Sequence, residues 1–170
     1  MESIILFLRL SRPLFLLGAV LLYALGAGIA HYLGTIFNWG LFWIGLVWVL
    51  VLQLSAHYLN EYYNAPYDQE NENRTPFSGG SGALGPGKLP RRSALIAALT
   101  TLTVLASLTV LVLAQWRIPL LPILIMGLAF LGAFFYSVPP VALERTGYGE
   151  LTTSFLVAFL LPGYLPCWCV

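Results

Sequence analysis

The sequence predicts an all-α integral membrane protein with about five transmembrane helices. The chain of 170 residues is 59% hydrophobic and only 9% charged, whereas an ordinary soluble domain has about 25% charged residues. Its apolar stretches are about twenty residues long, which is the length that crosses a hydrocarbon core of about 30 Å. They are too long and continuous for the alternating strands, of about ten residues each, of a transmembrane barrel. Residues 1–170 are therefore expected to form a single transmembrane domain.

The stretches that we expect to be helices lie at 13–35, 37–59, 93–115, 118–138 and 150–168. The first follows Arg9 and Arg12, as in a signal peptide, but it is longer than the usual hydrophobic region of about 7 to 15 residues and is interpreted as a retained helix. The last contains Pro162 and Pro166 and reaches Val170 without a charged or polar flank. We expect the chain to end inside this helix.

Basic residues divide unequally between the two sides of the predicted bundle. Arg117 lies alone on one side. The other side receives the N-terminus, a polar loop at 60–92 and a second loop at 139–149, with Arg9, Arg12, Arg74, Lys88, Arg91, Arg92 and Arg145. Because basic residues are retained in the cytoplasm, we expect this side to be cytoplasmic and the protein to lie in the inner membrane. No basic run indicates a nucleic-acid partner.

The polar block that begins at Asn60 is the predicted functional site. It holds four of the seven acids of the chain, Glu61, Asp68, Glu70 and Glu72. Asn60 and Asn64 are four residues apart, so they share a face if the second helix continues this far. Pro66 removes the helical hydrogen bond to the Tyr62 carbonyl, and we expect a bend there that turns Asp68 back toward the same space. The pattern predicts a cation site.

Magnesium fits this cation site better than zinc does. Mg²⁺ uses few protein carboxylates and keeps positions for water and phosphate oxygens, whereas zinc requires Cys or clustered His ligands. His31 and His57 are isolated, and each is interpreted as a hydrogen-bonded helix residue, although His57 could line the same pocket. Cys167 and Cys169 form an isolated C-x-C pair without metal-binding partners.

The second half of the polar block, PFSGGSGALGPG, predicts an anion site. It lacks the spacing of a nucleotide-binding P-loop, but its glycines let backbone N–H groups approach an anion, and a helix N-terminus follows. Arg74 is the favoured phosphate contact because it lies between the acids and the glycines. Arg91 and Arg92 are interpreted equally well as topology anchors, and Lys88 precedes them.

Three segments resemble a known family. The string N-E-Y-Y-N-x-x-x-D from Asn60, followed by R-T-P-F-S-G-G-S-G-x-L, is similar to the first aspartate-rich motif of the UbiA superfamily of membrane prenyltransferases. Within it, the dihydroxynaphthoate (MenA-like) branch is the most similar. Arg12 and Pro13 opening the first helix, and YSVPPVALERTGYGEL from Tyr136, also follow the family order.

The resemblance implies a nine-helix enzyme that transfers an isoprenyl group from a prenyl diphosphate to an aromatic acceptor in the membrane. The implied mechanism is Mg²⁺-assisted ionisation followed by electrophilic substitution, inside an apolar chamber that excludes water. The implied catalytic residues are Asn60, Glu61, Asn64 and Asp68, of which Glu61, Asn64 and Asp68 would bind the metal. The implied diphosphate contacts are Arg74, Lys88, Tyr136 and Arg145.

The chain departs from the family pattern in ways that leave a second function open. The acidic motif expected after a sixth helix is absent, so the chain resembles an N-terminal half, and a C-terminal half would be its partner. Glu61 and Asn64 stand where the family has aspartate, and Glu70 or Glu72 could replace the charge lost at Asn64. Ala142 stands where many relatives have lysine. The alternative is an inactive fragment or a non-catalytic membrane protein that binds lipid or assembles with another chain; a transporter is less favoured because the charges lie at helix ends.

Overall fold

The computed structural model describes residues 2–36, 38–70, 75 and 79–160, and these residues form helices and loops without a strand. The elements in chain order are α1 (Glu2–Leu10), α2 (Pro13–Tyr32), α3 (Trp39–Glu70), α4 (Arg91–Gln115), α5 (Leu120–Ser137), the 3₁₀ turn η1 (Leu143–Arg145), α6 (Gly149–Phe155) and the π-helical turn η2 (Leu156–Leu160). The predicted all-α class is confirmed.

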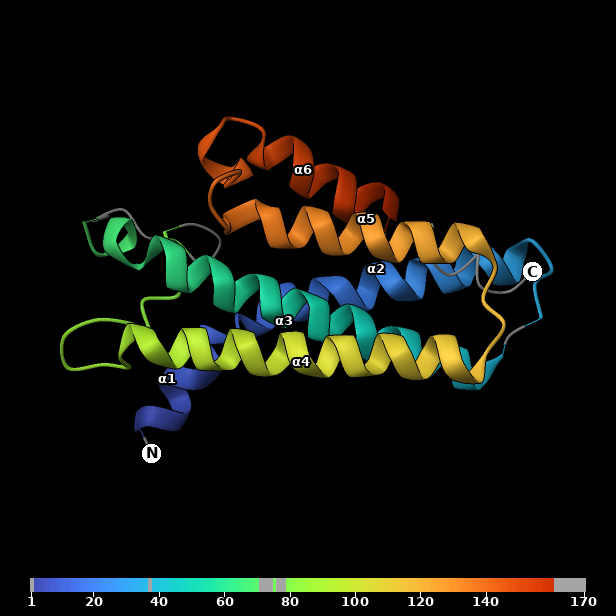
Figure 1. Ribbon diagram of the computed structural model, residues 1–170, viewed down its shortest axis with the longest axis horizontal. Helices are drawn as coiled ribbons and strands as arrows, with labels where there is room; N and C mark the ends of the chain where they lie inside the picture. Colours follow the sequence, from blue (N-terminus) through green and yellow to red (C-terminus); the bar gives the residue numbers. More distant parts are fainter. Residues whose placement is uncertain (1, 37, 71–74, 76–78, 161–170) are drawn as a thin grey trace.

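The long helices lie alongside one another in a bundle, with α3 in contact with α2, α4 and α5 (Figure 1). Among the described residues, four helices, α2 to α5, are long and apolar enough to cross a membrane, in agreement with four of the predicted stretches. The fifth begins at Gly149 as α6 and continues through η2 to Leu160. The rest of the predicted 150–168 helix lies outside the described residues.

One helix was not expected from the sequence. Residues Glu2–Leu10 form α1, which runs at an angle to the bundle near one end (Figure 1). Its last residue, Leu10, is fully buried. The chain then turns at Arg12, whose φ of 49° is left-handed, and Pro13 opens α2. Because proline has no N–H to lose at a helix start, this is a favourable place for it.

The chain does not leave the helix at Pro66, since α3 continues through it to Glu70. The proline removes the hydrogen bond that the Tyr62 carbonyl would accept inside the helix, but that carbonyl accepts a hydrogen bond from Arg91 Nε instead, at 2.6 Å. The neighbouring Tyr63 carbonyl accepts one from Arg145 Nη2 at 3.1 Å. Two arginines from other parts of the chain therefore donate hydrogen bonds to backbone carbonyls of the helical turn that the proline weakens. Asn60, Asn64 and Asp68 consequently share one helix face.

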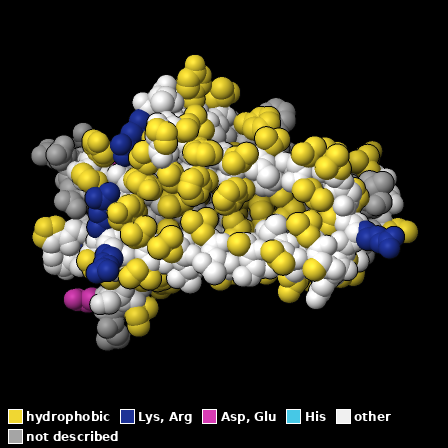
Figure 2. Space-filling view, viewed as in Figure 1, with side chains coloured by type: hydrophobic (Ala, Val, Ile, Leu, Met, Phe, Trp, Pro, Cys, Tyr) yellow, Lys and Arg dark blue, Asp and Glu magenta, His cyan; other side chains and the backbone are white. Residues whose placement is uncertain are grey.

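Two buried clusters hold the bundle together, one in the middle of the long helices and one at the end that α1 approaches. The middle cluster includes Tyr23, Trp48 and Leu105, with a hydrogen bond of 2.8 Å from Trp48 Nε1 to Thr109 Oγ1. The end cluster contains small residues of α4 that allow close helix contact, namely Ala94, Ala97 and Ala98. Many large hydrophobic side chains are exposed, and on the face that Figure 2 shows they lie along the helices while most of the visible basic side chains gather at one end. This surface suits a lipid bilayer.

Candidate functional site

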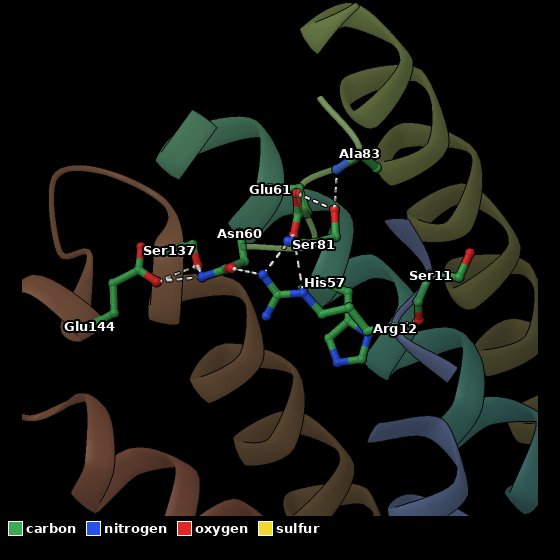
Figure 3. A network of polar contacts seen from close by, with 9 residues as sticks. All are labelled: Ser11, Arg12, His57, Asn60, Glu61, Ser81, Ala83, Ser137 and Glu144. Atoms are coloured by element: carbon green, nitrogen blue, oxygen red, sulfur yellow. Dashed lines mark hydrogen bonds and ion pairs between the residues drawn. The ribbon is translucent and has the colours of Figure 1, made fainter. Parts of the chain in front are cut away.

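The polar residues of the site meet at the end of the bundle where α2 begins and α3 and α5 end (Figure 3). Arg12 comes from the α1–α2 junction, Asn60 and Glu61 from α3, Ser81 from the glycine-rich loop, and Ser137 and Glu144 from the end of α5 and the turn that follows it. Most of the chain separates these segments, so the fold brings together the motifs that the sequence analysis considered one by one.

A buried ion pair lies at the centre of the first of two polar clusters. Glu61 is 3% exposed, and its Oε1 accepts hydrogen bonds from Arg12 Nη2 at 2.6 Å and Arg12 Nε at 3.0 Å. The Ser81 backbone N–H donates to the same oxygen at 2.6 Å, and the Ser81 hydroxyl donates to Oε2 at 2.8 Å. We call Arg12, Glu61 and Ser81 the ion-pair cluster. It ties the start of α2 and the glycine-rich loop to α3.

The second cluster surrounds Glu144. Asn60 Nδ2 lies 2.5 Å from Glu144 Oε2, and the Ser137 hydroxyl donates to the same oxygen at 3.2 Å. Asn64 Oδ1 accepts a hydrogen bond from Arg145 Nη2 at 3.0 Å, and the Asn64 side chain is close enough to Glu144 to lower the pKa of its carboxyl. Burial raises the pKa of the Glu144 carboxyl, and these hydrogen bonds together with the charge of Arg145 oppose that rise. We call Asn60, Asn64, Ser137 and Glu144 the amide cluster.

The remaining predicted acid, Asp68, lies against the glycine-rich loop. Gly80 has a left-handed φ of +74°, and a Cβ added there would come within 2.7 Å of Asp68 Cγ. The loop can approach the carboxylate this closely only because residue 80 has no side chain. Asp68, from the predicted cation site, and Gly80, from the predicted anion site, are therefore neighbours in the structure.

An apolar cavity of about 370 Å³ opens beside both clusters. Apolar side chains of α2, α3, α5 and η2 form most of its wall, including Phe15, Trp48, Leu52, Ile125, Ala129 and Leu156. Its polar lining comes from Arg12, Gln53, His57, Asn60, Tyr136 and Thr153. The cavity therefore offers space for a hydrocarbon group with charged and polar groups close to it.

Several predicted site residues reach this region, and others do not. Tyr136 lines the cavity, whereas Arg145 binds the α3 backbone and stacks over the Tyr67 ring at 4.6 Å. Lys88 Nζ donates to the Gly82 carbonyl at 2.8 Å, which gives it a role in holding the loop.

The described part of the chain does not include Arg74, Glu72 or the side chain of Glu70. His57 lines the cavity, and its Nδ1 lies 3.2 Å from the Ser11 carbonyl.

The oxygen donors fit Mg²⁺ in part. Among the described residues, no three His, Cys, Asp or Glu side chains come together, so a cation would be held by fewer carboxylates. That is the coordination that Mg²⁺ tolerates, because it keeps waters and uses substrate phosphates as ligands. Glu144 Oε1 is buried and accepts no hydrogen bond from a described residue, which leaves one carboxylate oxygen suited to a cation.

Three residues of the site were not predicted from the sequence, namely Arg12, Ser81 and Glu144. Arg12 was considered as a basic residue before the first helix and as part of the family resemblance, but no site role was predicted for it, whereas it lines the cavity and its guanidinium pairs with Glu61. Its position just before Pro13 could have drawn attention to it. Ser81 and Glu144 lie within the segments that resemble the family motifs, but their roles depend on contacts with α3 that only the folded chain makes.

Comparisons of this chain with protein-family models, with curated proteins and with solved structures found no match.

Proposed function

We propose that this protein is a membrane enzyme that binds a prenyl diphosphate and transfers its isoprenyl group to an aromatic acceptor of the quinone-precursor type. The observation that carries the proposal is the apolar cavity of about 370 Å³ with its polar lining. Cavities of about 300 to 1,000 Å³ are typical of small-molecule sites. A prenyl diphosphate combines an apolar tail with a highly charged head, which is the combination that this cavity offers.

The two ends of such a substrate would meet different parts of the chain. The tail would lie against the apolar wall, which includes Trp48, Leu52 and Ala129. The diphosphate would lie near Arg12, whose guanidinium reaches the cavity, and near the glycine-rich loop, where backbone N–H groups favour an anion. Asp68 and the amide cluster would hold the cation that accompanies the diphosphate. Bound Mg²⁺ would neutralise charge on the leaving diphosphate.

The chain itself would contribute positioning and the exclusion of water. Arg12 would stabilise negative charge that develops on the diphosphate as the allylic C–O bond breaks, as preorganised electrostatic groups do in other sites. The apolar wall would keep water from the allylic cation, which would otherwise yield the free prenyl alcohol. Tyr136 lines the cavity, and its ring face could stabilise that cation.

The setting that we propose follows from the distribution of charge. Arg12, Arg91 and Arg145 all donate hydrogen bonds to residues 60–63 of α3, at the end of the bundle that holds both clusters, and on the face that Figure 2 shows most of the visible basic side chains also lie at one end. Under the positive-inside rule this end faces the cytoplasm, where prenyl diphosphates, being charged, are soluble enough to reach it. We propose the inner membrane as the location. We also propose that a C-terminal half with a second acidic motif completes the enzyme.

The test is binding of geranyl diphosphate to the purified chain in detergent, with Mg²⁺ and with a chelator. We expect binding that requires Mg²⁺ and that Asp68→Ala weakens by about tenfold or more. The matched control, Arg92→Ala, removes an exposed charge next to the site and should weaken binding by about threefold or less. Equal effects of the two substitutions would show that the site is wrongly assigned. Pyrophosphate release with an added aromatic acceptor then tests turnover.

The second candidate, a lipid-binding protein without catalysis, is favoured by one observation. Glu61, a predicted metal ligand, is fully engaged by Arg12 and Ser81, so the motif serves the fold at this position. This candidate predicts that prenyl alcohol binds as tightly as prenyl diphosphate and that Mg²⁺ has no effect. The binding test described above therefore separates the two functions.

A further inference from the structure

We propose that Glu144 is a ligand of the divalent cation at this site and takes the place predicted for Glu61. The inference deepens the proposed function and depends on it, since it concerns the cation that would accompany the diphosphate. It differs from the sequence prediction in both the residue and the chain segment. The ligand would come from the turn after α5, whereas the predicted ligands Glu61, Asn64 and Asp68 all come from α3.

The Glu61 carboxylate has little capacity left to bind a cation. Its Oε1 accepts three hydrogen bonds, two from Arg12 and one from Ser81, and its Oε2 accepts one from the Ser81 hydroxyl. Moving this carboxylate onto a metal would leave the partly buried Arg12 without its counter-charge. Breaking a buried ion pair in this way is strongly unfavourable.

The Glu144 carboxylate, in contrast, has an oxygen available to bind a cation. The hydrogen bonds from Asn60 and Ser137 both go to Oε2. Oε1 is buried and accepts none from the residues that the structure describes. A buried acceptor without a partner is costly, and a cation bound to Oε1 would remove that cost.

The polar groups around Glu144 are arranged like the groups that orient a metal ligand. Asn60 donates a hydrogen bond to the carboxylate, and Asn64, one helical turn further along α3, accepts one from Arg145, the residue next to Glu144. Hydrogen bonds of this kind fix the direction of a ligand and tune its affinity. Asp68 lies one further turn along the same face of α3, so a second carboxylate is available. Waters and phosphate oxygens would complete the coordination of Mg²⁺.

The same contacts have an opposite interpretation, in which Glu144 is an internal anion that occupies the place of a phosphate group. The amide donors and Arg145 would then serve the substrate once Glu144 moved away. The unsatisfied Oε1 favours the cation ligand, because a stand-in for phosphate would be expected to use both oxygens. The two interpretations predict opposite effects of neutralising Glu144.

The experiment measures Mn²⁺ binding to the purified full chain in detergent, without any diphosphate, from the EPR signal of the free ion. We expect wild-type protein to bind Mn²⁺ and Mg²⁺ to displace it. Glu144→Gln should weaken Mn²⁺ binding by about tenfold or more. The matched control Glu150→Gln, which makes the same charge change at an exposed residue, should change it by about twofold or less.

A rescue variant separates ligand loss from misfolding. The Asn64 side chain lies close enough to Glu144 to affect the pKa of its carboxyl, so Asn64→Asp in the Glu144→Gln background returns a carboxylate close to the same place and should recover most of the Mn²⁺ affinity. Unchanged Mn²⁺ binding in Glu144→Gln, no Mn²⁺ binding by the wild type, or no recovery in the double variant would overturn the proposal. Tighter binding of inorganic pyrophosphate by Glu144→Gln would overturn it in favour of the internal anion.

Geranyl diphosphate binding by the same variants distinguishes this inference from the proposed function. Mg²⁺-dependent binding that is lost in Asp68→Ala but intact in Glu144→Gln would reject Glu144 as a ligand and leave the proposed function standing. Mn²⁺ binding that requires Glu144, together with no affinity for geranyl diphosphate, would support the cation ligand and reject the prenyl diphosphate as substrate.

Discussion

The ion-pair cluster and the amide cluster are built around carboxylates from different segments, and they differ in how completely those carboxylates are satisfied. In the ion-pair cluster, both oxygens of Glu61 accept hydrogen bonds and an arginine balances the charge. In the amide cluster, only one oxygen of Glu144 accepts hydrogen bonds from described residues. Asn60 contacts both, since its Oδ1 accepts from Arg12 Nη2 at 3.1 Å.

The difference indicates that the ion-pair cluster stabilises the fold and that the amide cluster binds a ligand. A fully satisfied buried ion pair fixes the positions of the segments that it joins, and removing one partner is costly. A carboxylate with an unused oxygen contributes less to the fold and has capacity for a ligand. We therefore expect substitutions in the ion-pair cluster to change stability and substitutions in the amide cluster to change binding.

The largest expected loss of stability is for Glu61→Gln. Neutralising Glu61 leaves the charge of Arg12 partly buried, and we expect the free energy of unfolding in detergent to fall by about 3 kcal/mol. Adding Arg12→Met should recover much of this loss, because the uncompensated charge is then absent. A loss below about 1 kcal/mol for the single variant would show that the ion-pair cluster does not hold the fold.

The next effect concerns the contact between Asp68 and the loop. Gly80→Ala forces a left-handed alanine and brings its Cβ against the Asp68 carboxylate. We expect the free energy of unfolding to fall by about 2 to 3 kcal/mol, with weaker Mg²⁺-dependent binding of geranyl diphosphate. Gly87→Ala is the control, because Gly87 has a φ of +71° with nothing within 4 Å of its Cβ.

Gly87→Ala should lower the free energy of unfolding by only about 1 kcal/mol, which is the cost of a left-handed backbone at alanine. Its binding of geranyl diphosphate should stay unchanged. Equal losses of stability and binding in both variants would mean that the Asp68 contact has no influence on the site.

A smaller loss is expected for Arg91→Ala. Arg91 donates to the Tyr62 carbonyl and lies over the Tyr62 ring at 4.3 Å, and at this exposed position we expect about 1 kcal/mol of stability to be lost. Pro66→Ala restores a backbone donor for that carbonyl, so the same substitution should cost less in its background. An unchanged cost would show that Arg91 does not replace the helical hydrogen bond.

The smallest change in stability is expected for Glu144→Gln. Glutamine keeps an oxygen for Asn60 and removes a partly buried charge, so thermal unfolding in detergent should show no change or a gain of up to about 1 kcal/mol. A loss as large as that of Glu61→Gln would remove the contrast between the two clusters.

Much of the fold could be predicted from the sequence, because membrane helices must satisfy their backbone hydrogen bonds internally and cover themselves with apolar side chains. The four spans at 13–32, 39–68, 91–115 and 120–137 follow from that requirement alone. The continuation of α3 through Pro66 could not be predicted. It depends on Arg91 and Arg145, which come from distant parts of the chain and donate to carbonyls in this turn.

The site could be predicted only in part. Helical spacing indicated that Asn60 and Asn64 share a face, whereas Asp68 was expected to reach the same space after a bend at Pro66, and α3 instead continues through Pro66 to include it. The motif also favoured Glu61 as a metal ligand, and nothing local reveals that Arg12 and Ser81 engage it. Glu144 was missed for the same reason, since its partners on α3 lie far from it in the sequence.

The central claim is that the apolar cavity and the polar clusters form one site for one amphipathic substrate. The most direct measurement compares geranyl diphosphate with inorganic pyrophosphate, both with Mg²⁺, on Ala129→Phe, which fills the cavity wall. Ala106→Phe on the exposed face of α4 is the control. We expect Ala129→Phe to lose geranyl diphosphate binding and keep pyrophosphate binding, while Ala106→Phe keeps both. Unchanged geranyl diphosphate binding by Ala129→Phe would contradict the claim.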